Sequence, residues 1–75
     1  MDRALTIDEL TAEIRAVTSP SDARAVVNRA SRVAGVPHNR ALELQELLLV
    51  CAALAAEGGL IQEVADSIAT RALDD

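Results

Sequence analysis

The sequence predicts an all-α fold: a small four-helix bundle-like domain over residues 1–75, with a long, largely buried third helix. Three observations support this prediction. Apolar residues recur at intervals of three and four, capping signals separate the periodic segments, and no segment alternates apolar and polar residues as a strand would. The helices are expected at about 7–17, 20–34, 38–57 and 60–73.

Well-defined boundary signals predict the first two helices. Thr6 and Glu9 are spaced as a capping box, in which each side chain accepts a hydrogen bond from the backbone amide of the other residue. Ser19 is a favourable N-cap ahead of Pro20, whose missing N–H costs nothing at the first helical position. Gly35 suits the left-handed residue that commonly follows a helix. The second helix is therefore expected to end just before Gly35.

The third and fourth helices are predicted from a long apolar stretch and a pair of glycines. The third helix is expected to begin near residues 37–39 and to continue to Glu57, where Gly58 and Gly59 end it. No polar residue apart from a cysteine lies between Glu46 and Glu57. The fourth helix is indicated by apolar residues at helical spacing, namely Ile61, Val64, Ala65, Ile68 and Ala72.

The composition excludes several classes of function. The chain has fifteen alanines and no aromatic residue, so it lacks the side chains that stack nucleic-acid bases or form aromatic cages. The lone Cys51 can form neither an intramolecular disulfide nor a structural zinc site, and it is expected to be a small buried hydrophobe. No signal-peptide pattern opens the chain, and its apolar run is shorter than the ~20 residues of a membrane span. A cytoplasmic protein without cofactor, metal or small-molecule substrate is expected.

The apolar run from Leu47 to Ala56 is the main indication of a partner. It is apolar on every side of a helix, which is typical of a helix buried all round. Because a chain of this size buries only ~60% of its surface on folding, complete enclosure requires all the other helices or a second chain. We expect a homodimer or a complex with another helical protein, and a monomer that encloses its own third helix is the alternative. The residues expected at the interface are Leu47, Leu48, Val50, Leu54 and Ile61.

The charges are unevenly distributed along the chain. The net charge is −5, yet no acidic residue lies between positions 23 and 42, where Arg24, Arg29, Arg32 and Arg40 are found. On one interpretation these arginines cover a solvated helix face and pair with acids of the first helix such as Glu9 and Glu13. On the other interpretation they contact DNA phosphates.

The segment from Val27 to Glu46 combines an amphipathic helix, a turn glycine with a following apolar residue, and the start of a second helix. Its motif positions are Ser31 at the helix crossing, Gly35 and Val36 in the turn, and Ala30, Ala34, Ala41 and Leu44 in the core. This segment resembles a helix-turn-helix DNA-binding motif. The resemblance implies that the third helix is the recognition helix. The candidate DNA contacts are Arg29, Arg32, His38, Asn39 and Arg40.

Two further considerations decide which hypothesis leads. Glu43 and Glu46 follow on the same expected face of the third helix, where they would repel phosphates. His38 is the only histidine and has no evident partner, and no serine lies in a nucleophile-elbow sequence, so no enzyme is predicted. The leading hypothesis is a small helical protein–protein interaction or regulatory module that self-associates through its third helix. A DNA-binding transcriptional regulator is the alternative.

Overall fold

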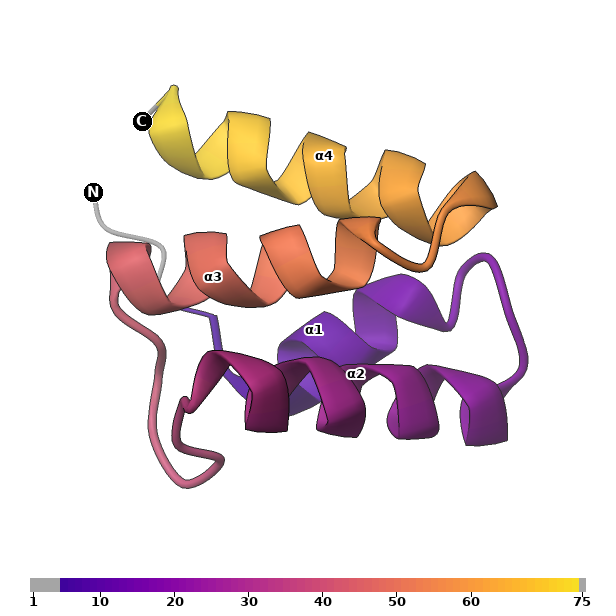
Figure 1. Ribbon diagram of the computed structural model, residues 1–75, viewed down its shortest axis with the longest axis horizontal. Coiled ribbons are helices and arrows are strands. Elements are labelled where there is room, and N and C mark those ends of the chain that lie inside the picture. Colours follow the sequence, from indigo (N-terminus) through magenta and orange to yellow (C-terminus); the bar gives the residue numbers. More distant parts are fainter. Residues whose placement is uncertain (1–4, 75) are drawn as a thin grey trace.

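The computed structural model describes residues 5–74, which form four helices and no strand (Figure 1). The prediction of an all-α fold is therefore confirmed for this part of the chain. The expected domain also includes residues 1–4 and Asp75, which lie outside the described residues. The helices are α1 (Ile7–Ile14), α2 (Pro20–Ala34), α3 (Leu44–Ala55) and α4 (Gly59–Leu73).

The predicted start of α1 is formed by side-chain capping. The amide of Glu9 donates to Thr6 Oγ1 at 3.1 Å, and the amide of Thr6 donates to Glu9 Oε1 at 3.0 Å. These two bonds satisfy donors that the first turn of a helix cannot use internally. α1 nevertheless ends at Ile14 rather than at residue 17 as expected. The amides of Ala16 and Val17 bond to carbonyls three residues back, which tightens the chain into turns before the next helix.

The bounds of α2 agree with those expected. Ser19 Oγ accepts from the amide of Asp22 at 3.2 Å, and Pro20 occupies the first helical position. At the other end Gly35 has φ +70°, a conformation that other residues adopt only at a cost. The amide of Val36 then returns to the carbonyl of Ser31 at 3.1 Å, so the last turn is closed and Val36 is buried.

α3 begins at Leu44, not near residue 38, and this corrects the predicted boundary. The segment before it is held in a non-helical path because the amide of Leu42 donates across the fold to the carbonyl of Leu5 at 2.7 Å. A helix starting at residue 38 would need that same amide for its own ladder. Instead the amide of Glu43 donates to Glu46 Oε1 at 2.9 Å, which satisfies a donor at the observed start of α3.

The third helix is also not the longest one. α3 has 12 residues, whereas α2 and α4 have 15 each. It ends at Ala55 because the amides of Glu57 and Gly58 bond back to carbonyls three residues earlier, and Gly58 then turns the chain with φ +77°. Among the helices described, none is long and apolar enough to cross a membrane.

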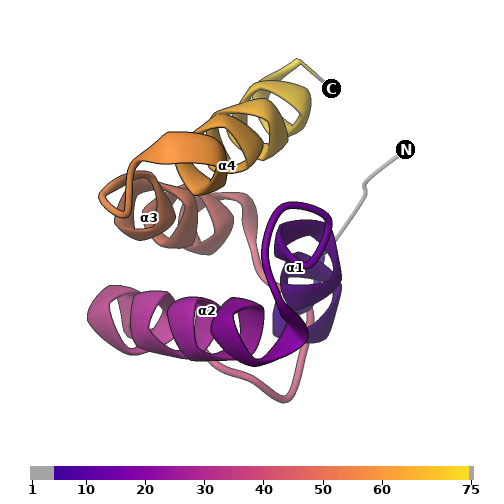
Figure 2. The same cartoon turned by 90° about the vertical axis from the view of Figure 1, so that its right-hand side faces the viewer.

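α3 lies between α2 and α4, while α1 packs on α2 and also contacts α4 (Figures 1 and 2). Neighbouring helices α2 and α3 run in opposite directions, as do α3 and α4. Figure 2 looks along the long axis of the molecule. In this view α2, α3 and α4 form a layer, and α1 lies on one side of that layer only. α3 is consequently buried toward α2 and α4 but open on the side away from α1, with Leu44 and Leu49 exposed. The expectation that it is largely buried is therefore only partly correct.

Candidate functional site

The strongest candidate site is the side of α3 that no other helix covers. We define the open face of α3 as Leu48, Leu49, Ala52 and Ala56, which follow one another at helical spacing. The side chain of Leu49 is 55% exposed, Leu48 is half-buried, and both alanines are exposed. No charged residue lies on α3 between Glu46 and the residue after its last turn, Glu57. The open face is therefore continuously apolar along the helix.

Two exposed apolar side chains extend this surface onto the neighbouring helices. Val33 of α2 is exposed one turn after Arg29, whose guanidinium reaches Glu57 at the end of α3. Leu73 is the last residue of α4, at the end of the molecule where α3 begins (Figure 1). Both are exposed apolar side chains on the two helices that flank α3.

The five residues expected at an interface fall into two groups. Leu47, Val50 and Leu54 are buried in the chain's own core, so they cannot contact a partner in this fold. Leu48 belongs to the open face, and Ile61 of α4 is half-buried against the core. The sequence analysis missed Leu49, Ala52 and Ala56, although they belong to the same apolar run. Periodicity alone could not identify them, because a helix that is apolar all round gives no indication of which side α2 and α4 cover.

Each end of the open face is bordered by an ion pair. At the C-terminal end Arg29 Nη2 lies 2.8 Å from Glu57 Oε2. At the N-terminal end both guanidinium nitrogens of Arg40 bond the carboxylate of Glu46, at 3.0 and 2.9 Å. This bidentate bond, together with the bond from the amide of Glu43, lowers the pKa of Glu46.

These pairs change the interpretation of the basic segment. Arg29 and Arg40 were candidate DNA contacts, but both are paired with acids that flank α3 rather than with acids of α1. Glu13 of α1 pairs instead with Arg71 of α4 at 3.0 Å. Arg32 and Asn39 are exposed, and neither forms a side-chain hydrogen bond within residues 5–74. The candidate DNA contacts His38, Asn39 and Arg40 precede α3 and do not lie on a recognition helix.

His38 has a partner that the sequence analysis did not identify. Its Nε2 lies 2.7 Å from Ser31 Oγ, and the Ser31 hydroxyl donates its proton to the carbonyl of Asn28 at 2.8 Å. With its proton donated to that carbonyl, the Ser31 hydroxyl can accept from the His38 tautomer that carries a proton on Nε2. Ser31 is also completely buried. The pair therefore holds the turn against α2, and it does not present an activated serine to a substrate. The only sequence feature that pointed to this hydrogen bond was Ser31, a small polar residue at the expected helix crossing.

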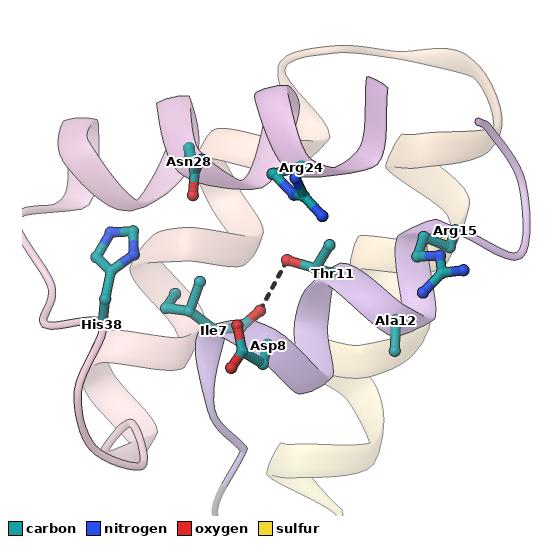
Figure 3. A pocket seen from close by; sticks show the side chains of 8 residues that line it. All are labelled: Ile7, Asp8, Thr11, Ala12, Arg15, Arg24, Asn28 and His38. Atoms are coloured by element: carbon teal, nitrogen blue, oxygen red, sulfur yellow. Dashed lines mark hydrogen bonds between the residues drawn. The ribbon is translucent and has the colours of Figure 1, made fainter. Parts of the chain in front are cut away.

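A cleft of about 340 Å³ lies between α1 and α2 (Figure 3). Its lining residues are Ile7, Asp8, Thr11, Ala12, Arg15, Arg24, Asn28 and His38. The Thr11 hydroxyl donates to the carbonyl of Ile7 at 2.9 Å, so its proton serves the helix. Arg15 and Arg24 are exposed and form no ion pair within the described residues.

The remaining chemically reactive side chain is sequestered. Cys51 is buried on the covered side of α3, where burial and the charge of Asp66 raise the pKa of its thiol to about 11. It is thus a neutral core residue at physiological pH, as the sequence analysis expected. Within residues 5–74 no three histidine, cysteine, aspartate or glutamate side chains are grouped so that they could hold a metal ion.

Comparison of the chain with protein-family models, with curated proteins and with solved structures finds no match.

Proposed function

We propose that this chain is a small cytoplasmic protein–protein interaction or regulatory module that self-associates through the open face of α3. The observation that supports the proposal is the apolar surface formed by the open face, in which Leu49 is 55% exposed and no charged residue follows Glu46 within α3. Contiguous apolar surface of this kind is characteristic of sites that bind another protein.

The size of the surface is consistent with such a role when the neighbouring helices are included. A stable interface buries about 800 Å² from each partner, which is more than one helix face supplies. Val33 of α2 and Leu73 of α4 are exposed on the helices that flank α3, so we propose that the partner also covers these two side chains. The binding free energy is expected to concentrate on Leu48 and Leu49, because large apolar side chains near the centre of an interface contribute most.

Measurement of the solution mass at several protein concentrations tests the proposal. We expect a dimer by light scattering after size exclusion, and we expect Leu49→Glu to convert it to a monomer, because burying an unpaired carboxylate is costly. Leu60→Glu is the matched control. Leu60 is 58% exposed, but it shares a flank of α4 with Arg71, which contacts α1.

Circular dichroism on both variants verifies that the helices are retained. If the unsubstituted protein is a monomer at all concentrations, self-association through α3 is wrong. If Leu49→Glu remains a dimer, the interface lies elsewhere on the molecule.

DNA binding has less support than self-association. Arg29 and Arg40 are compensated by Glu57 and Glu46, and the residues expected to read bases precede α3. Retention of the protein on duplex DNA at low salt, lost as salt is raised, would restore this alternative because phosphate contacts release counterions. We expect no such retention.

A further inference from the structure

We infer that the second copy packs antiparallel to the first, so that Leu48 and Leu49 of each copy lie against the alanines of the other. This inference rests on the proposed function, because it specifies how two copies use the same open face. It follows from two independent features of α3, the distribution of side-chain size along the helix and the direction of the helix dipole.

Side-chain size changes along the open face. The N-terminal half presents Leu48 and Leu49, whereas the C-terminal half presents Ala52 and Ala56, all at least partly exposed. In a parallel dimer leucine would meet leucine and alanine would meet alanine, which leaves crowding at one end and a gap at the other. In an antiparallel dimer each pair of leucines fills the space above the alanines of the other copy. Close packing of large against small side chains favours the antiparallel arrangement.

The helix dipole favours the same arrangement. Each end of α3 carries a complete ion pair, Arg40–Glu46 at one end and Arg29–Glu57 at the other, so the side-chain charges there are already compensated. A parallel dimer would set the like partial charges of the two helix ends beside each other. An antiparallel dimer sets the N-terminus of each α3, with its partial positive charge, beside the C-terminus of the other.

The antiparallel arrangement makes a specific geometric prediction. The exposed positions along this side of the helix are Gln45, Leu49, Ala52 and Ala56. A two-fold axis at the middle of this stripe passes between Leu49 and Ala52, and it therefore brings Gln45 of one copy opposite Ala56 of the other. The two copies of Gln45 are then about 16 Å apart along the helix, at a rise of 1.5 Å per residue. A disulfide requires Cα atoms within about 7 Å, so oxidation distinguishes the two arrangements.

The experiment uses a Cys51→Ala background, in which the full chain carries either Gln45→Cys or Ala56→Cys. Both positions are exposed, and Ala12→Cys on α1 measures collisional cross-linking away from the open face. We expect a covalent dimer only when the two variants are mixed and oxidised, and we expect it to disappear when Leu49→Glu is added to both chains. Covalent dimers from either variant alone, above the Ala12→Cys level, would overturn the antiparallel arrangement.

The solution mass separates failure of this inference from failure of the proposed function. Before oxidation, each cysteine variant is measured by light scattering, and its helix content is verified by circular dichroism. A monomer refutes self-association itself. A dimer that cross-links at identical positions, or that gives no mixed disulfide, retains self-association and refutes the antiparallel geometry.

Discussion

The two sides of α3 are almost equally apolar, yet they have opposite environments. One side contributes Leu47, Val50, Cys51 and Leu54 to the core between α2 and α4. The other side, the open face, is left uncovered because α1 packs on the opposite side of the layer formed by α2, α3 and α4 (Figure 2). Hydrophobicity alone therefore does not decide which surface of a helix becomes core. The decision depends on how many helices the rest of the chain can supply, and a chain of 75 residues supplies too few.

The largest expected difference between the two sides is in stability. Leu54 is completely buried, and Leu54→Ala should lower the free energy of unfolding by about 2–5 kcal/mol, because it leaves a cavity that the surrounding helices fill only partly. Leu49→Ala on the open face should cost about 0.5 kcal/mol or less within a single chain. Urea denaturation at several protein concentrations measures both. If the two substitutions lower the free energy of unfolding equally at every protein concentration, the two sides of α3 do not differ.

A cysteine on each side sharpens the comparison. The Cys51 thiol, whose pKa is raised to about 11, should react with a disulfide reagent at least about tenfold more slowly than an exposed thiol. Ala52→Cys in a Cys51→Ala background places a thiol on the open face of the same helix. Because the proposed dimer covers that face, the rates are compared at a protein concentration low enough for the chain to be a monomer. Measured rates that are equal in the folded proteins would contradict the burial of Cys51.

The same thiol makes stability depend on pH. Because folding raises the pKa of Cys51 from about 9 to about 11, the neutral thiol is favoured in the folded state. The associated stabilisation is complete below about pH 9 and is lost as the pH rises toward 11. Cys51→Ala should remove this loss of stability above about pH 9, as measured by urea denaturation at several pH values. The control is the same measurement on Ala52→Cys in the Cys51→Ala background.

The smallest expected effect concerns the ion pair at the N-terminal end of the open face. Arg40→Gln removes both guanidinium bonds to Glu46, so the pKa of Glu46 should rise toward its ordinary value. NMR titration of the side-chain carboxyl measures this shift. Since a lowered pKa stabilises the fold at neutral pH and that contribution is lost on acidification, the variant should also lose less stability as the pH falls. Arg32→Gln is the control, because Arg32 forms no ion pair within the described residues.

The local boundaries of the fold could be predicted where one residue type determines the backbone. The Thr6–Glu9 capping box, the Ser19 cap and the turn at Gly35 are all present, because short-range hydrogen bonds and a left-handed φ depend only on neighbouring residues. The start of α3 could not be predicted in this way. It depends on the bond from Leu42 to Leu5, which joins segments far apart in the sequence.

The candidate site was predictable to a similar extent. The apolar run was identified, but its division into core and open face depends on the positions of α2 and α4, and the run itself gives no periodicity. The partners of the arginines were also not predictable, since Arg29 reaches Glu57 across the α2–α3 contact. Only the Arg40–Glu46 pair is close in sequence, and it forms because the intervening segment is not helical.

The bond between Leu42 and Leu5 also bears on the order in which the chain folds. α3 and α4 are joined by a short glycine turn and can form a local hairpin early, with little loop-closure entropy to overcome. The Leu42–Leu5 contact encloses α1, α2 and the turn after them, so it closes the longest of these loops and is expected to form late. The contact of the N-terminal segment with Leu42 would then be the last to form on folding. Transient local unfolding of the native state should begin at the same place.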